Sequence, residues 1–490
     1  MQLARRVLKN SFFNSMRALI SGIAGFAFSV VLARFLTPDL FGIYALAMSV
    51  CFFILQLDPG TGYTAIRYIS YALGKENESL ARGYFRFLLK ARLLLGFTFS
   101  FSLAILSKSL AFQVFNKPEL FIPLEILSLF IFIFFLTDFL DCCFEAFQNF
   151  KYPALRHAIY ESSKIGLVLP FVIMGFFYGI FIGITIAAFA TFIVMFLALR
   201  KKYGVLFRGD AAEIEKMRVL RFLSFISIGS FSGVVFGYVD MIMLGIFLPA
   251  EYAGYYKAAT NIIFGIAGLT AISGVLFPVF TRLEEESLED AFKKVFKYSS
   301  ILSIPFAVSL AYFSEQIISV VYGVEYLPAA LPLLILSPII VFNSTNFFGT
   351  LFGAKEKPEY ATAVSITSMT LNVVLNYFLI LHIGMIGAAI ATAISRLFNI
   401  AAMGILSSMI LKIAPDANSI YKPLFASMIM FAFLHFSSHP TTLFIGILEL
   451  CVAVAVYFAV LFLTRGIGRE DLMYAKMVVG ADFSYFNKQR

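Results

Sequence analysis

The sequence predicts an all-α polytopic membrane protein with about 14 transmembrane helices, arranged as two parallel six-helix lobes plus two extra C-terminal helices. Three observations predict this fold class. The composition is too apolar for a soluble chain, long apolar runs recur along the whole length, and one short stretch of sequence occurs twice.

The composition identifies lipid as the solvent of most of the chain. Of the 490 residues, 60% are hydrophobic and only 14% are charged, whereas a typical soluble domain has about 25% charged residues. The net charge of +9 does not indicate nucleic acid, because the basic residues lie between apolar runs, where they set the topology and contact anionic lipid headgroups. The four cysteines lie in or beside apolar runs without metal-ligand spacing, so we expect them to be packing residues.

Each predicted helix is an apolar run close to the length of about 20 residues that crosses a bilayer. The runs lie at residues 13–33, 40–57, 92–107, 120–140, 158–177, 179–199, 222–247, 258–280, 298–314, 328–352, 360–381, 386–411, 423–437 and 441–463. Lys and Arg are concentrated in every second connecting segment, beginning with the N-terminal one, and such segments stay in the cytoplasm. We therefore expect a multi-pass protein of the cell (plasma) membrane with both termini cytoplasmic. No hydrophilic segment is long enough for a catalytic domain, so we do not expect an enzyme.

An internal repeat predicts the two lobes. The stretch LARFLTPDLFGIYALA at residues 32–47 matches LGIFLPAEYAGYYKAA at residues 244–259, with six identities in sixteen positions that include Gly42/Gly254 and Tyr44/Tyr256. The copies join the first span to the second and the seventh to the eighth. An offset of six helices makes the lobes parallel. The predicted divisions are an N-terminal six-helix lobe (1–205), a C-terminal six-helix lobe (206–412), and helices 13 and 14 with a cytoplasmic tail (413–490).

Three stretches together resemble a known family. LARFLTPDLFGIYALA after an apolar first span, VDMIMLGIFLPAEYAGYYKAAT at residues 239–260 and LNVVLNYFLILHIGMIGAAIATAIS at residues 371–395 occur in the order typical of polysaccharide flippases. These transporters of O-antigen and other lipid-linked oligosaccharides belong to the multidrug/oligosaccharidyl-lipid/polysaccharide flippase superfamily. The resemblance implies a fourteen-helix fold that moves a lipid-linked oligosaccharide from the inner to the outer leaflet by alternating access.

Four basic residues at membrane depth are predicted to bind the phosphate of such a substrate, since buried charges are costly and usually face a cavity or a partner. Arg67 follows a Pro and two Gly that should break the second helix at residues 58–62, and guanidinium binds phosphate in a bidentate way. The others are Arg396, Lys257 and Arg34. Pairing with an acid, or an interfacial position, is the alternative for each.

Acids and amides within the spans are further candidates. Asp58, Asp138, Asp141 and Asp240 are predicted either to couple transport to an ion or to pair with arginines. Asn372 and Asn376 lie four residues apart and therefore share a helix face, where amides bind sugar hydroxyls or join helices. The histidines show no metal-ligand spacing, so no metal site is predicted.

The predicted function is translocation of a polyprenyl-(di)phosphate-linked oligosaccharide to the outer leaflet, for assembly of cell-surface polysaccharide or glycan. Membrane lipids and glycan assembly enzymes are the expected partners, and nucleic acid is not. No cofactor is expected, since the chain lacks GxxxxGK[ST], and coupling to an H⁺ or Na⁺ gradient is left open. The alternatives are an ion-coupled multidrug exporter, which predicts an acid-rich cavity, and a polytopic glycan-processing membrane enzyme.

Overall fold

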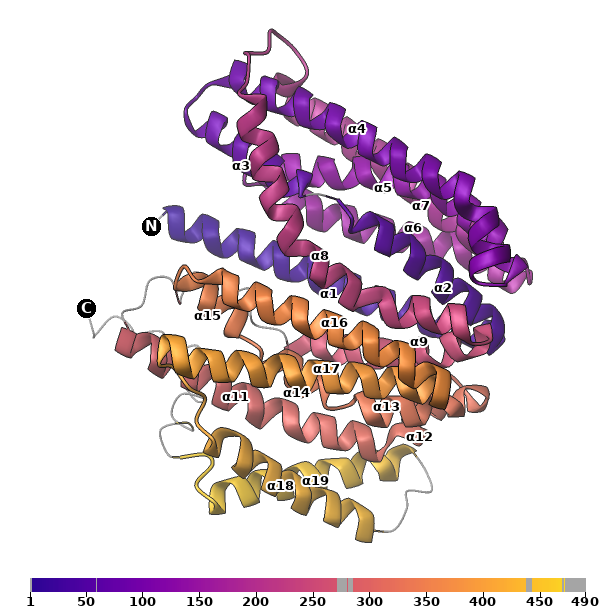
Figure 1. Cartoon of the computed structure of the whole chain (residues 1–490), viewed down its shortest axis with the longest axis vertical. Coiled ribbons are helices and arrows are strands. Elements are labelled where there is room, and N and C mark those ends of the chain that lie inside the picture. The colour runs from indigo at the N-terminus through magenta and orange to yellow at the C-terminus, as the bar shows by residue number, and fades with distance from the viewer. Residues whose placement is uncertain are drawn as a thin grey trace. The chain divides into compact units, whose positions relative to one another are not determined.

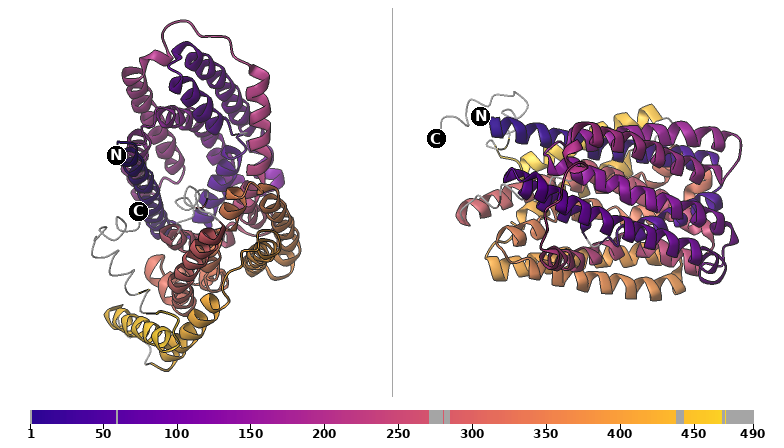
Figure 2. Two further views of the ribbon diagram at one scale, coloured as in Figure 1. Left: turned by 90° about the vertical axis from the view of Figure 1, so that its left-hand side faces the viewer. Right: turned by 90° about the horizontal axis from the view of Figure 1, so that it is seen from above.

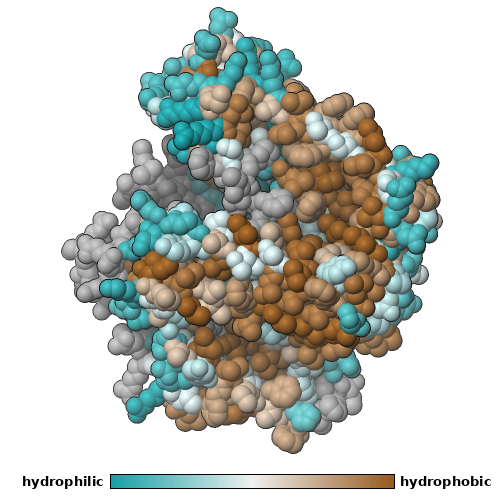
Figure 3. All heavy atoms as spheres, in the orientation of Figure 1, coloured by the Kyte–Doolittle hydropathy of each residue, from teal (hydrophilic) through white to brown (hydrophobic). Residues whose placement is uncertain are grey.

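The computed structural model describes residues 2–58, 60–270, 280, 285–437, 443–468 and 471. All regular elements within these residues are helical, so the predicted all-α fold class is confirmed (Figure 1). A lipid solvent favours this outcome because a helix satisfies its backbone hydrogen bonds within one segment. On the face drawn in Figure 3, hydrophobic residues gather over the middle of the helices and hydrophilic residues near their ends.

The helices follow one another along the chain with short connections. They are α1 (Gln2–Phe35), α2 (Pro38–Leu55), α3 (Thr61–Gly74), α4 (Glu78–Ser109), α5 (Phe121–Ala146), α6 (Lys151–Ile173), α7 (Gly179–Lys202), α8 (Lys216–Phe247), α9 (Ala250–Thr270), α11 (Glu285–Tyr312), α12 (Ser314–Val321), α13 (Ala330–Leu336), α14 (Ile339–Thr345), α15 (Phe348–Ala354), α16 (Pro358–Ile383), α17 (Met385–Leu406), α18 (Asn418–Phe436) and α19 (Leu443–Leu463). Short helical turns η1 to η5 lie at Leu110–Val114, Pro118–Leu120, Gly204–Leu206, Val324–Ala329 and Ser407–Leu411.

The predicted apolar runs fall on these helices, apart from residues 271–279 and 441–442, which lie outside the described residues. Among the described residues, nine helices are long and apolar enough to cross a membrane. The bent pair Val324–Leu336 and Ile339–Ala354, with a 43° angle, brings the number to ten. The predicted number of about 14 also counts α6, α8, α9 and α19, which are helical but are not among the ten.

The chain packs into two compact units that do not follow the chain order. The first comprises Met1–Leu269, Glu315–Pro332 and Ser365–Ser395, and the second comprises Thr270–Ser314, Leu333–Val364 and Arg396–Arg490. In the first unit, α4, α5 and α7 pack side by side, as do α6 and α7 (Figure 2). In the second, α11 packs against α14 and α18. The lobe boundaries at residues 205 and 412 stay a prediction.

The second span is broken where the sequence predicts. Helix α2 ends at Leu55 and α3 begins at Thr61, after Gly60 in the left-handed region at φ 74°. The hydroxyl of Thr61 donates to the Asp58 carboxylate at 2.7 Å and so ties the two sides of the break together. The break therefore leaves backbone groups outside the helical hydrogen-bond pattern, and within a membrane such groups need a lining of protein or water.

The two copies of the sequence repeat lie against each other. A Cβ atom built on Gly42 would lie 1.8 Å from the carbonyl oxygen of Ala250, and one built on Gly254 would lie 2.3 Å from that of Pro38. Residue 250 corresponds to residue 38 in the repeat, so the contact is reciprocal. Matching glycines recur in the repeat because only glycine permits this approach of two helix backbones.

Candidate functional site

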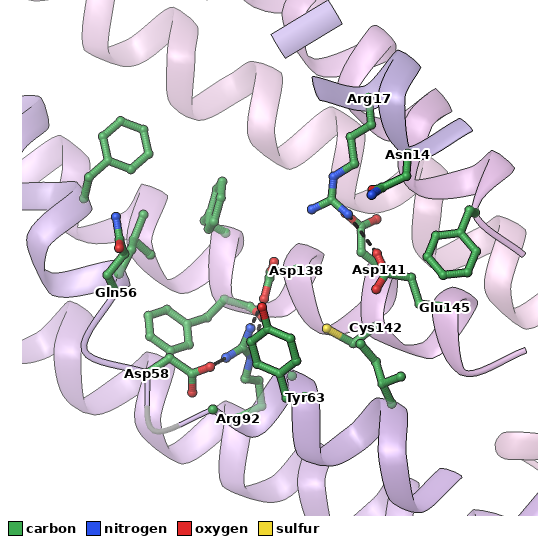
Figure 4. A pocket seen from close by; sticks show the side chains of 18 of the residues that line it. Asn14, Arg17, Gln56, Asp58, Tyr63, Arg92, Asp138, Asp141, Cys142 and Glu145 are labelled. Atoms are coloured by element: carbon green, nitrogen blue, oxygen red, sulfur yellow. Dashed lines mark hydrogen bonds and ion pairs between the residues drawn. The ribbon is translucent and has the colours of Figure 1, made fainter. Parts of the chain in front are cut away.

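A large cavity lies within the first unit, beside the break in the second span. Its volume is about 1020 Å³. It is lined mainly by residues of α1, α2, α3, α4 and α5: Asn14, Arg17, Phe52, Leu55, Gln56, Asp58, Gly60, Gly62, Tyr63, Ile66, Arg92, Phe134, Phe135, Asp138, Asp141, Cys142, Glu145, Phe150 and Tyr238. Charged and amide side chains lie beside aromatic rings, as they do in sites that bind sugars and phosphates (Figure 4). We refer to this cavity as the polar pocket.

Arg92 fixes one wall of the polar pocket. Its guanidinium lies between Asp58, at 2.6 Å, and Asp138, with which it also forms an ion pair (Figure 4). It further donates to the Thr61 hydroxyl at 2.7 Å and to the Phe135 carbonyl at 3.0 Å. Only 2% of its side chain is exposed. Arg92 therefore has its partners within the protein, and its evident role is to hold the broken second span against α5.

Arg17 lies across the polar pocket and is more accessible. Its side chain is 28% exposed, and it pairs with Glu145 at 2.8 Å. Its Nε donates to Nε2 of His157 at 3.0 Å, and Arg156 also places an N–H donor 2.6 Å from that nitrogen. Two donors facing Nε2 require it to be the unprotonated nitrogen of a neutral imidazole, because a guanidinium cannot accept a hydrogen bond. Arg17 is therefore the guanidinium of the lining that can most easily exchange its partner for a ligand.

Carboxylates outnumber guanidinium groups around the polar pocket. Four acids line it, and each pairs with an arginine: Asp58 and Asp138 share Arg92, Glu145 pairs with Arg17, and Asp141 pairs with Arg156 at 2.7 Å. The network thus holds four acids and three arginines. One carboxylate in excess leaves a place for a proton or a cation, since like charges this close do not all remain ionised without compensation.

A second polar cluster surrounds Asp240 of α8, also within the first unit. The carboxylate accepts from Asn376 at 2.7 Å, from the Tyr256 hydroxyl at 2.8 Å and from the Thr392 hydroxyl. The amide of Asn372 donates to the same Thr392 at 3.2 Å. Both asparagines are fully buried, yet their side-chain oxygens have no hydrogen-bond donor in the described structure. The cluster therefore presents an acid together with two buried acceptors that lack a partner.

The repeat explains why this cluster occurs once. Tyr256 corresponds to Tyr44, and Asp240 corresponds to Phe28. Tyr44 packs edge-on against Phe28, with ring centroids 6.5 Å apart, where Tyr256 donates a hydrogen bond to Asp240. In both copies the tyrosine contacts the residue sixteen positions before it, but that residue is a phenylalanine in the first copy and an aspartate in the second. The carboxylate therefore belongs to the second copy alone.

The predicted basic residues lie elsewhere. Arg67 is exposed on α3 outside the pocket lining, with its guanidinium 4.4 Å from the centre of the Phe222 ring. Arg34 is exposed and donates to the carbonyls of Val320 and Val321, at the last turn of α12. A cation is favourable at a helix C-terminus, which gives Arg34 a structural role.

Lys257 and Arg396 are half-buried on α9 and α17, and neither lines the polar pocket. No ion pair joins Lys257 to a described residue. The assignment of these basic residues to substrate binding stays a prediction.

The arginines that the structure places at or beside the pocket are not among the residues predicted from the sequence. Arg17, Arg92 and Arg156 were counted among the basic residues of the cytoplasmic segments. Arg92 is nevertheless the first residue of the predicted run 92–107, and this was the one sequence signal that it belongs to a span rather than to a loop. The structure shows that α4 begins fourteen residues before it. Asp138 and Asp141 pair with Arg92 and Arg156 rather than with the arginines that the sequence singled out, and their role in ion coupling stays a prediction.

The helices define the class of protein as a polytopic all-α membrane protein. The chain has the fold of the lipid II flippase MurJ in an inward closed conformation, with a TM-score of 0.77 and 17% identity over 95% of this chain and 99% of that one. It also resembles an inward-facing multidrug resistance transporter of the MATE family, with a TM-score of 0.66 and 14% identity over 82% and 94% of the two chains. Identities this low show the fold alone.

The chain belongs to the polysaccharide biosynthesis protein family, whose sequence pattern matches residues 7–284. It is 29% identical over 182 residues to the probable low-salt glycan biosynthesis flippase Agl15 of Haloferax volcanii, covering 35% of this chain and 38% of that protein. It is 26% identical over 333 residues to the succinoglycan biosynthesis transport protein ExoT of Rhizobium meliloti, covering 66% and 64% of the two chains. These matches span less than two thirds of the length of either relative. The match to the family over residues 7–284 confirms the resemblance predicted from the sequence.

Proposed function

We propose that this protein is a flippase that moves a polyprenyl-(di)phosphate-linked oligosaccharide from the cytoplasmic to the outer leaflet by alternating access. The observation that carries the proposal is the polar pocket of about 1020 Å³ in a helix bundle of the flippase fold. The headgroup of such a lipid cannot cross hydrocarbon unaided, because its hydroxyl and phosphate groups would lose their hydrogen bonds. The pocket supplies amides, tyrosines and arginines that replace them.

The chemistry of the proposed headgroup site divides between two arginines. Arg17 is accessible, and its partner Glu145 is a single carboxylate that a diphosphate can displace, since guanidinium binds phosphate oxygens in a bidentate way. Arg92 stays with Asp58 and Asp138 and keeps the wall in place. Binding to Arg17 would free Glu145 to take up a proton or a cation.

The proposed coupling site is the cluster at Asp240. A buried carboxylate and the two unpartnered amide oxygens of Asn372 and Asn376 suit either a proton or a sodium ion. Such coupling would supply the direction of transport without ATP. The topology proposed with this function has both termini in the cytoplasm and the chain in the plasma membrane, with glycan assembly enzymes as partners.

Liposomes test the function directly. Purified protein is reconstituted with a fluorescent polyprenyl-diphosphate glycan, and a membrane-impermeant quencher reports how fast the lipid becomes accessible from outside. We expect wild-type protein to accelerate exchange and Arg17→Gln to lose most of that acceleration. Arg200→Gln, at an exposed position on α7, is the matched control and should exchange at the wild-type rate. Loss in Arg67→Gln but not in Arg17→Gln would move the site to Arg67.

One observation favours a second candidate function. The excess of carboxylates over arginines around the polar pocket suits an organic cation, so the protein would then be an ion-coupled multidrug exporter. The same vesicles separate the two functions. Gradient-driven uptake of an organic cation, without exchange of any lipid-linked glycan, would support the exporter and overturn the flippase. In either case Asp240→Asn should abolish the dependence of transport on the coupling gradient.

A further inference from the structure

The repeat contact consists of Pro38 and Gly42 in the first copy and Ala250 and Gly254 in the second. The contact joins backbone to backbone, because each glycine faces a carbonyl oxygen of the other copy. The amide nitrogen of Gly254 would also lie 3.1 Å from a Cβ on Gly42, and that of Gly42 would lie 3.1 Å from a Cβ on Gly254. No side chain fills this space, so the two helix starts exclude water between them by direct contact.

Hydrogen bonds on each side of the contact repeat the same symmetry. The Lys117 ammonium donates to the carbonyl of Leu248 at 2.9 Å and to that of Gly245 at 2.6 Å. The Tyr326 hydroxyl donates to the carbonyl of Leu36 at 3.3 Å. Residue 36 corresponds to residue 248 in the repeat. In each copy, the carbonyl that follows the preceding helix therefore accepts a hydrogen bond from a side chain of a separate connecting segment.

The repeat contact lies at the opposite end of α1 from the polar pocket. Arg17 lines the pocket, whereas Phe35 ends α1 just before the contact. Eighteen residues of helix separate them, which corresponds to roughly 27 Å at 1.5 Å per residue. The contact and Arg17 therefore lie near opposite faces of a membrane about 30 Å thick.

We propose that the repeat contact is the closure of the transport path on the side away from the start of α1, and that its two glycines set how often the path opens on that side. This inference rests on alternating access in the proposed function. A closure made of two corresponding helix starts opens when their backbones separate, and no interlocked side chain has to be withdrawn. The glycines favour the closed state because any larger residue would hold the backbones apart.

The native Cys142 provides the readout because it lines the polar pocket. The other three cysteines are replaced by serine, and Cys142 is labelled with a membrane-impermeant maleimide from the side of the membrane that holds the α1–α2 turn. Gly42→Ala and Gly254→Ala are compared with Gly25→Ala, because a Cβ on Gly25 meets nothing within 4 Å. We expect about tenfold faster labelling in the first two variants, the factor that corresponds to ~1.4 kcal/mol, and the unmodified rate in the third.

Lys117→Met tests the same closure without adding volume at the contact, and it also serves if the glycine variants do not fold. It removes the bonds to Leu248 and Gly245 and should accelerate labelling as well. Unchanged labelling in Lys117→Met and in every glycine variant that folds would overturn the proposal. The labelling needs no substrate. If liposomes show no lipid exchange while labelling responds as expected, the proposed function fails and the closure stands.

Discussion

Replacement of Arg92 by methionine should destabilise the first unit strongly. The change removes one guanidinium and leaves the carboxylates of Asp58 and Asp138 without a cation. It also removes the hydrogen bonds that Arg92 donates to the Thr61 hydroxyl and the Phe135 carbonyl. Removing one partner of a buried ion pair costs about 3–5 kcal/mol. The two carboxylates are 17% and 32% exposed, so water compensates in part, and we expect about 3 kcal/mol.

Thiol reactivity measures this loss of stability, because the chain has no tryptophan. Cys51 and Cys143 are buried outside the pocket lining and become reactive toward a fluorogenic maleimide as the protein unfolds on heating, once Cys142 and Cys451 are replaced by serine. Arg92→Met should lower the unfolding midpoint well below that of wild type. The exposed control Arg200→Gln should change the free energy of unfolding by less than about 0.5 kcal/mol.

A combined variant tests the assigned cause. Arg92→Met with Asp58→Asn and Asp138→Asn removes the cation and both charges that it compensates. This triple variant should be more stable than Arg92→Met alone, because no carboxylate remains uncompensated. The reasoning would be refuted by an Arg92→Met protein as stable as wild type, or by a triple variant that recovers nothing.

Two further predictions concern stability elsewhere. Burial raises the pKa of Asp471, but hydrogen bonds from Lys297 and two other donors outweigh burial and lower that pKa below the ordinary 3.8. The ion pair between Asp471 and Lys297 should therefore persist at neutral pH and be lost only as the pH falls below 3.8. Asp471→Asn should accordingly speed tryptic cleavage of the C-terminal tail at pH 7, seen as a shorter band on a gel; an unchanged rate would contradict this. Gly387→Ala should cost about 1–3 kcal/mol, because its Cβ would lie 2.3 Å from the Leu379 carbonyl oxygen, whereas Gly166→Ala meets nothing within 4 Å; equal unfolding midpoints for the two would argue against the contact.

The repeat illustrates which features of the fold the sequence predicts and which it does not. Matched residues at Gly42/Gly254 and Tyr44/Tyr256 predicted a duplication, and composition predicted helices in lipid. The sequence could not show that the matched glycines contact each other's copy, because that approach is a property of two helices packed together. Asp240 was selected as a buried acid from its sequence alone. Its hydrogen-bond donors Tyr256, Thr392 and Asn376 lie on three other helices. The cluster therefore depends on how the helices pack and could not be predicted from the sequence.

The sequence by itself determined the solvent, the secondary structure and the break in the second span. These depend on hydrophobicity over about 20 residues and on the local conformational limits of Pro and Gly, both of which act within one segment. Only the tertiary structure decided which charges meet. Arg92 lies on α4 and its carboxylates lie in the α2–α3 break and on α5, while Arg67 lies outside the pocket. Charge pairing depends on which helix faces turn toward each other, and that is fixed by the packing of whole helices rather than by any single stretch of sequence.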